Sequence, residues 1–333
     1  MTETLAVSTL PTTPVGQSWK DKVANNGIWV ALFGLIIFNL IATSNFASLQ
    51  TVQTNLGQMA TVGIAAVGMT LIMATGGIDL SVGSVMAVSG AAAGFVILSD
   101  ISNQGNSFVS TLVILGVTVI AAVLFGLLNG FLVGSLGIQP IVATLAVMIT
   151  ARGIAQLITS GRLYAVENEQ ILWLGRGKFL SIPVMAWIML AIFTIAIWVC
   201  NRTVFGRQLV AVGGNAKAAQ LAGVPTVRIK YIVYCVGAAL AAVAALMSVG
   251  VNGTVDTANL GLGYEFSVIS AVVVGGTSLV GGRPKLLGTL GGVVLLQLLT
   301  FTLASHNIPK EVASLIQAAV IVLAVSAQIR KRK

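Results

Sequence analysis

The chain has 333 residues, of which 56% are hydrophobic and only 8% are charged, and its formal net charge is +9. A soluble domain of this length needs far more charge to cover its surface, so the composition excludes an ordinary soluble protein. The mean hydropathy is +0.98. Because apolar runs of about twenty residues recur along the sequence, we interpret the chain as an all-α, polytopic membrane protein. Its positive charge is then a matter of membrane topology rather than of nucleic-acid binding.

The chain divides into a tail, a membrane domain and a second tail. Residues 1–26 are polar and lack the charge order and cleavage pattern of a signal peptide, so we expect a cytoplasmic N-terminal tail. A transmembrane domain follows over residues 27–328, and a basic cytoplasmic tail covers 329–333. Within the domain we expect about ten spans, at residues 27–44, 56–75, 82–98, 109–134, 138–159, 182–200, 230–250, 265–280, 286–304 and 310–328.

Lys and Arg are distributed unequally between the two sides of these ten spans. Thirteen lie on the side that carries both termini, and four lie on the opposite side. Because Lys and Arg accumulate in cytoplasmic loops, this distribution predicts that both termini are cytoplasmic. An odd number of spans would place the two termini on opposite sides and remove this asymmetry, which favours the count of ten.

Glycines at a spacing of four occur in the span 109–134, where Gly126, Gly130 and Gly134 share one helix face. Small residues at this spacing let helix backbones approach closely in lipid. The pattern is typical of packing within one subunit, which we favour, or of a dimer seam. A short echo between "GGIDLSVG" (76–83) and "GGRPKLLG" (281–288) predicts two sharp turns that need the conformational freedom of glycine.

Polar side chains are expensive in such a chain, since a charge in a bilayer costs on the order of 3 kcal/mol. Asp79 is the only acid near the core of a span, and it either caps the next helix or helps to gate or pass a substrate. Arg152 either reaches outward or pairs with an acid of another helix. The other candidates, for a polar pathway or for bonds between helices, are Ser81, Asn129, Gln139 and Thr144.

The sequence lacks the residue sets of known catalytic sites. His306 is the only histidine, so a zinc site of the HExxH type is excluded, and no GxSxG motif occurs. The segment "GTSLVGGRP" superficially resembles a phosphate-binding loop, but Arg-Pro stands where Lys-Ser/Thr is required. We therefore expect a transport protein rather than an enzyme, with no metal or cofactor and no ATP hydrolysis of its own.

The loop 201–230, "NRTVFGRQLVAVGGNAKAAQLAGVPTVRIK", carries five cations and no acid. Asn215 suits an N-cap, residues 216–222 are mostly good helix formers, Gly223 suits the position after the helix, and Pro225 prevents its continuation. We therefore expect one short helix on the cytoplasmic surface. Because a lone helix of two turns is marginal in water, it should pack on the membrane domain or on a second protein.

Four segments resemble, in order and in register, the membrane permease subunits of ribose-type ATP-binding-cassette importers. They are "ATGGIDLSVGSVMAVSGA", "GLLNGFLVGSLGIQPIVATLAVMITARGIAQLIT", "FGRQLVAVGGNAKAAQLAGVPTVRIK" and "VISAVVVGGTSLVGGRPKLLGTLGG". The resemblance implies a homodimer in the lipid bilayer of a bacterial inner membrane, with a central pathway at its seam. It also implies a cytoplasmic ATPase and a periplasmic binding protein that delivers a pentose or hexose. A nucleoside or an autoinducer is the alternative substrate within this class.

The resemblance further implies that the loop 201–230 holds a coupling helix, which enters a cleft of the ATPase. The matching positions are Phe205, Gly206, Arg207, Ala211, Gly213, Gly214, Asn215, Ala218, Ala219, Leu221, Ala222 and Gly223. Two other protein classes compete with this interpretation. An ion-coupled secondary transporter would normally need ionisable groups at mid-membrane, and an intramembrane enzyme needs a nucleophile with its base. The sequence favours neither of them.

Overall fold

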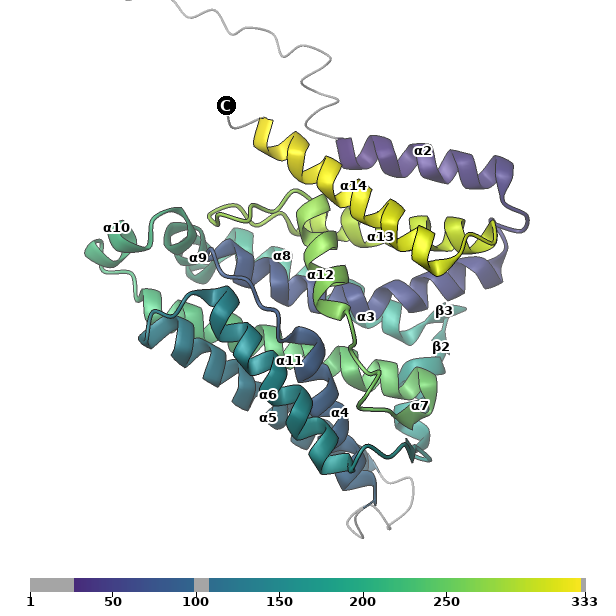
Figure 1. The fold of residues 1–333 in the computed structure, drawn as a ribbon, viewed down its shortest axis with the longest axis horizontal. Helices are drawn as coiled ribbons and strands as arrows, with labels where there is room; N and C mark the ends of the chain where they lie inside the picture. The colour runs from purple at the N-terminus through teal and green to yellow at the C-terminus, as the bar shows by residue number, and fades with distance from the viewer. Residues whose placement is uncertain (1–26, 99–107, 331–333) are drawn as a thin grey trace, which may run out of the picture.

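The computed structural model describes residues 27–98 and 108–330, which fold into a bundle of helices (Figure 1). The predicted tail 1–26 and residues 331–333 of the predicted basic tail lie outside the described residues. Each of the ten apolar runs that the sequence predicts is helical over most of its length. The chain thus has the largely helical architecture of a polytopic membrane protein.

Three helices form the buried centre of the bundle. They are α3 (Leu49–Ala74), α4 (Val82–Leu98) and α11 (Thr226–Asn252). Where α3 and α11 cross, a Cβ atom added to Gly68 would lie 2.7 Å from the Cα atom of Gly237. The two backbones therefore touch, because glycine leaves no side chain between them.

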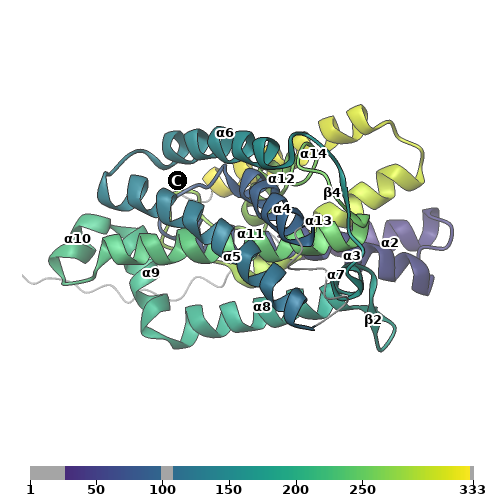
Figure 2. The same ribbon diagram turned by 90° about the horizontal axis from the view of Figure 1, so that it is seen from below.

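Further helices cover this centre on two sides. The helix α5 (Phe108–Gly130) packs along α11 and continues as a π-helical turn, η2 (Phe131–Ser135). The helix α6 (Pro140–Thr159) packs on α4, and α8 (Val184–Arg202) packs on α3. Figure 2 shows α6 and α8 on opposite sides of α11. The centre is therefore enclosed by helices that come from different parts of the sequence.

The chain ends form a second group of helices beside α3. The helices α12 (Tyr264–Val274) and α13 (Leu286–Ser305) pack against α3, and α2 (Gly27–Ala42) and α14 (Lys310–Arg330) pack against α13 and α12 respectively. Six helices are long and apolar enough to cross a membrane by length and composition, namely α3, α5 with η2, α6, α8, α11 and α13. The other four predicted spans correspond to α2, α4, α12 and α14. The apolar part of each of these helices is shorter than in the six long ones.

Short strands and one short helix connect several of the long helices. The strands β1 (Tyr164–Ala165) and β4 (Thr254–Val255) pair antiparallel, as do β2 (Lys178–Phe179) and β3 (Ile182–Pro183). The helix α7 (Glu169–Arg176) lies near these strands and packs on α11 (Figure 1). These two-residue strands are the only β structure in the described part of the chain.

The loop 201–230 differs from its prediction, because it contains two helices instead of one. The helix α10 (Ala216–Leu221) matches the predicted helix, but α9 (Val204–Gly214) precedes it. At the start of α9, the N–H of Gly206 donates to the side-chain oxygen of Thr203 over 3.4 Å. The side chains of Leu209 and Val212 are buried, so packing stabilises a helix whose three glycines weaken its intrinsic propensity.

The three glycines predicted to lie at a helix contact all face α11 of the same chain. A Cβ atom on Gly126 would lie 2.8 Å from the Cα of Cys235, and one on Gly130 would lie 3.0 Å from the Cα of Tyr231. Gly134 makes a looser contact, since its added Cβ would lie 3.4 Å from the ring of Tyr231. This geometry corresponds to packing within one subunit, the alternative that the spacing favours.

Candidate functional site

The connection between α3 and α4, residues 75–81, is a buried polar segment that we call the polar turn. The helix α3 ends here because Gly76 has a φ of +79°, which continues no right-handed helix. The hydroxyl of Thr75 donates to the carbonyl of Ile72 over 2.7 Å, and the N–H of Gly77 donates to the same oxygen over 3.2 Å. The carbonyl of Ile72 is thereby bonded, and that of Met73 accepts the N–H of Gly76 over 2.9 Å.

Asp79 is the centre of a hydrogen-bonded chain in the polar turn, with only 2% of its surface exposed. Its Oδ1 accepts bonds from the N–H and the hydroxyl of Ser81, over 2.7 and 2.5 Å. The Nδ2 of Asn129, on α5, donates to the Ser81 hydroxyl oxygen over 2.8 Å. The carboxylate, the hydroxyl and the amide therefore tie α5 to the polar turn.

The capping role considered for Asp79 takes a different form in the structure. The carbonyl of Ser81 accepts the N–H of Val85 over 2.8 Å, so Ser81 occupies the position just before α4. Asp79 bonds to Ser81 and not to the first N–H groups of the helix. Asp79 consequently holds the turn that leads into α4, as an Asx turn does.

Thr144 fixes the polar turn from the side of α6. Its Oγ1 accepts the N–H of Leu80 over 3.1 Å and lies 3.3 Å from the carbonyl oxygen of Ile78. It also lies 2.8 Å from the carbonyl oxygen of Pro140, one turn earlier in the same helix. Four of the six predicted pathway residues, Asp79, Ser81, Asn129 and Thr144, thus meet at one place.

The remaining two pathway candidates lie elsewhere. Gln139 is exposed at the start of α6, where its side chain makes no capping bond. Arg152 lies further along α6, and its Nη1 donates to the carbonyls of Thr257 and Leu260, over 3.0 and 2.7 Å. The charge of Glu265, on α12, also acts on Arg152, although no direct ion pair joins these two described side chains. Arg152 therefore connects α6 with the segment before α12.

Two buried polar atoms near the polar turn bond to no other described residue. They are the Oδ1 of Asn129 and the hydroxyl of Tyr234, which is on α11. A Cβ atom added to Gly77 would lie 2.8 Å from that hydroxyl, so Tyr234 reaches the polar turn itself. The sequence gives no signal for Tyr234, because one tyrosine in an apolar helix is an ordinary core residue.

The polar turn also contacts the loop 201–230 through backbone atoms. The N–H of Gly282, in the connection between α12 and α13, donates to the carbonyl of Ala74 over 2.9 Å. A Cβ atom added to Gly213, near the end of α9, would collide with both of these groups, and one on Gly281 would lie 2.8 Å from the nitrogen of Gly76. We call this meeting of three backbones the glycine junction. It joins the two turns that echo each other in the sequence.

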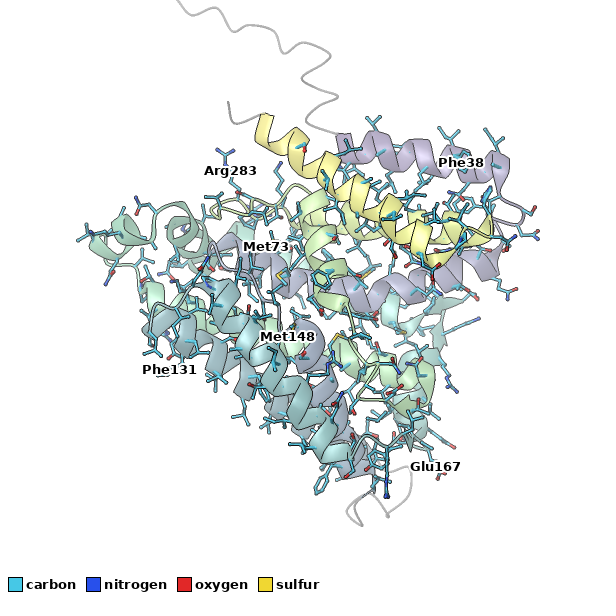
Figure 3. All side chains as sticks on the ribbon, viewed as in Figure 1. Phe38, Met73, Phe131, Met148, Glu167 and Arg283 are labelled. Atoms are coloured by element: carbon cyan, nitrogen blue, oxygen red, sulfur yellow. The ribbon has the colours of Figure 1, made fainter. Side chains whose placement is uncertain are left out.

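Residues on the two sides of the glycine junction differ sharply in their exposure. Figure 3 shows Met73 inside the molecule, whereas the side chain of Arg283 points away from it. Met73 is fully buried one residue before Ala74, and Arg283 is exposed one residue after Gly282. The junction therefore lies where the buried core meets the surface that carries α9 and α10.

The helix α10 has the predicted caps. The Oδ1 of Asn215 accepts the N–H of Ala218 over 3.0 Å, and Gly223 has a φ of +82°. Ala219 packs inward, whereas 84% of the Leu221 side chain is exposed. Four of the five cations of the surrounding loop are also exposed, namely Arg202, Arg207, Lys217 and Arg228. This end of the bundle thus presents an apolar tip in a positively charged surface.

Comparison with known proteins gives consistent matches. The family model described as the permease component of branched-chain amino acid transport systems matches residues 52–325. The chain is 34% identical to the fructose import permease protein of Bifidobacterium longum, over 91% of this chain and 88% of the relative. It is 38% identical to the galactofuranose transporter permease protein of Escherichia coli, over 80% and 76% of the two chains. It is 34% identical to the ribose import permease protein of Escherichia coli, over 91% and 93%. No solved structure matches the chain significantly.

Proposed function

Because this chain belongs to the family described as the permease component of branched-chain amino acid transport systems, we propose that it is the membrane subunit of an ATP-driven monosaccharide importer. It is a transport component of the bacterial inner membrane rather than an enzyme. The observation that carries the proposal is the similarity to fructose, galactofuranose and ribose permeases over at least three quarters of both chains. Its substrate is a pentose or a hexose, and a nucleoside or an autoinducer is the alternative.

Two other proteins work with this subunit. A cytoplasmic ATPase hydrolyses ATP, and a periplasmic binding protein delivers the sugar. The loop 201–230 is the docking site of the ATPase. What supports this role is its surface, since Leu221 and four cations are exposed around a capped helix that cannot be stable alone. Apolar tips surrounded by charge are typical of protein contact sites.

The glycine junction transmits the motion of the docked ATPase to the membrane helices. Closure of the ATPase on ATP moves α10 and α9, and Gly213 touches the ends of α3 and of the α12–α13 connection without an intervening side chain. A backbone contact of this kind transfers a displacement directly, because no rotamer can absorb it. The helices then exchange between outward- and inward-open states, whose populations the partners shift.

Ten helices cross the membrane, and both termini face the cytoplasm. This topology is supported by the charge distribution of the loops. It is also supported by the direction of the chain, since the start of α2 and the end of α14 lie toward the end of the bundle that carries α9 and α10 (Figure 1). Two copies of the subunit form the transporter, with the sugar pathway at their seam.

The experiment that tests this function combines binding and uptake. The cognate binding protein is purified, and its affinities for ribose, fructose, arabinose and a nucleoside are measured by calorimetry. Membrane vesicles that contain the complete complex are then supplied with ATP inside and with the loaded binding protein outside. We expect accumulation of the sugar that binds most tightly. Failure of the complete complex to accumulate any of these solutes would contradict the proposal.

A further inference from the structure

A cluster of uncharged polar side chains lies in the half of the bundle remote from α9 and α10. The Nε2 of Gln297, on α13, donates to the Oδ1 of Asn55 over 3.1 Å and to the Oε1 of Gln58 over 2.7 Å. One turn further along α3, the hydroxyls of Thr61 and Tyr264 are 3.1 Å apart. We call these five residues the amide–hydroxyl cluster. It joins α3, α12 and α13.

The remote position of the cluster follows from the contacts of α3. Near its start, Gln53 donates to the carbonyl of Ser181, beside β3, over 2.7 Å. At its other end, Ala74 belongs to the glycine junction. Residues 55–61 therefore lie in the first half of the helix, which is the outer half in the proposed topology.

The cluster keeps unused hydrogen-bonding capacity, which distinguishes it from other polar contacts of the bundle. Within the described residues, the Nε2 of Gln58 and the Oε1 of Gln297 bond to no protein atom, and Gln58 is exposed. By contrast, Asn39 donates to Leu35 and to Thr302, accepts a bond from Thr43, and is fully buried. The cluster is therefore more than a tie between helices.

Exposure to lipid does not explain Gln58. Exposed threonines of the long helices, such as Thr194, bond to the carbonyl four residues earlier and so satisfy their own hydroxyl. Gln58 makes no such bond to its own helix, and a free amide in hydrocarbon costs several kcal/mol. An exposed amide nitrogen without a partner in a spanning helix, like the Nε2 of Gln58, indicates contact with water or with a polar ligand.

We propose that the amide–hydroxyl cluster is a transient contact site for an uncharged, hydroxyl-rich solute on its way through the outer half of the pathway. This inference rests on the function proposed above and adds the residues at the contact. Gln58 is exposed, and Gln297 and Tyr264 are half-buried. The buried Asn55 and Thr61 hold Gln297 and Tyr264 in place. An amide offers a donor and an acceptor at once, which suits a sugar hydroxyl that is both. The ring of Tyr264 adds an apolar surface with a polar edge. The absence of charge in the cluster keeps the contact weak enough for release.

Accessibility to a water-soluble thiol reagent tests where Gln58 points. Cys200 and Cys235 are first replaced by alanine, and Gln58→Cys and Thr194→Cys are introduced separately into the full complex in membranes. The reagent is a positively charged methanethiosulfonate. We expect it to label Gln58→Cys and to leave Thr194→Cys unlabelled. Equal reactivity of both positions, or no reaction at either, overturns the inference.

Uptake kinetics test the contact itself. Removing one neutral hydrogen bond in the transition state lowers a rate by roughly 2- to 10-fold. We therefore expect Gln58→Ala to lower the maximal uptake rate by about this factor, with the half-saturating concentration of loaded binding protein unchanged. The bond between Gln297 and Asn55 is kept in this variant, so the helices stay tied. Unchanged maximal uptake in Gln58→Ala overturns the inference.

A control variant separates transport from stability. Asn39→Ala removes a buried bond between α2 and α13, so we expect it to lower the melting temperature and to leave uptake per folded complex unchanged. If Gln58→Ala also acts only on melting temperature, the cluster is a structural tie and the inference fails. If the unmodified complex shows no ATP-dependent uptake, the proposed function fails instead, and the two failures are thus distinguishable.

Discussion

The backbone N–H of Gly282 donates to the carbonyl oxygen of Ala74 over 2.9 Å, although the two residues are far apart in the sequence. Gly213 lies against both groups, with no room for a side chain. The end of α3, the connection before α13 and the end of α9 therefore form one contact. We therefore expect a displacement of α9 to act on α3 and α13 at once.

We expect Gly213→Ala to uncouple ATP hydrolysis from transport, because its Cβ would collide with the carbonyl of Ala74 and the N–H of Gly282. Overpacking of this kind costs about 1–3 kcal/mol. Uptake should fall strongly, while the ATPase still binds at the exposed surface of α10. Gly214→Ala is the matched control, since nothing lies within 4 Å of its added Cβ. The prediction is wrong if the two variants transport equally well.

Leu221→Glu should weaken the attachment of the ATPase. The side chain is 84% exposed at the tip of α10, so the change leaves the fold of the free subunit unaltered. A central apolar anchor contributes about 2 kcal/mol or more to binding, which corresponds to roughly 30-fold in affinity. Co-purification of the ATPase measures the loss. Leu262→Glu alters an equally apolar, exposed residue of another loop and should not affect ATPase retention.

Two variants near the polar turn should differ in their effect on stability. Asn129→Ala removes the donor to Ser81 and should destabilise the subunit by about 1–3 kcal/mol. Tyr234→Phe removes a buried hydroxyl that bonds to no other described residue, so it should not destabilise the subunit and should raise its stability, by up to about 1–3 kcal/mol. Thermal unfolding in detergent measures both. A large loss of stability in Tyr234→Phe would mean that a bound water or solute uses the hydroxyl.

Arg152 and Glu265 should show energetic coupling in a double-mutant cycle. Arg152→Met removes two bonds to backbone carbonyls and leaves the buried Glu265 carboxylate without its opposite charge. Each lost hydrogen bond from a charged donor costs about 1.5–3 kcal/mol. Adding Glu265→Gln should restore part of that stability, by about 0.5–3 kcal/mol. Strictly additive melting shifts would show that the two charges do not interact.

The elements that hydropathy and caps define were predictable from the sequence. Each predicted apolar run is helical over most of its length. A run of about twenty apolar residues lies in lipid or in the protein core, where only a helix hydrogen-bonds all of its own backbone groups. The caps of α10 at Asn215 and Gly223 were also predictable, since both act through local bonds. Local rules failed at α9, whose glycines disfavour a helix that packing then stabilises.

The candidate site was predictable in part for the same reason. Asp79, Ser81, Asn129 and Thr144 stood out because each is polar in an apolar chain, and the structure brings them together. Their common location depends on how α5 and α6 pack, which no local pattern encodes. The contact of Gly213 with Ala74 and Gly282 joins three distant segments through backbone atoms. Side-chain chemistry carries no signal of such a contact.

The most direct test of the account is solute accumulation by the purified subunit in liposomes. The subunit is reconstituted alone and, in parallel, with the ATPase, internal ATP and the loaded binding protein. We expect accumulation only in the second preparation, because the proposed function requires an ATPase that moves the helices through the loop 201–230. Concentration of the sugar by the subunit alone, under a proton gradient and without the ATPase, would contradict the account.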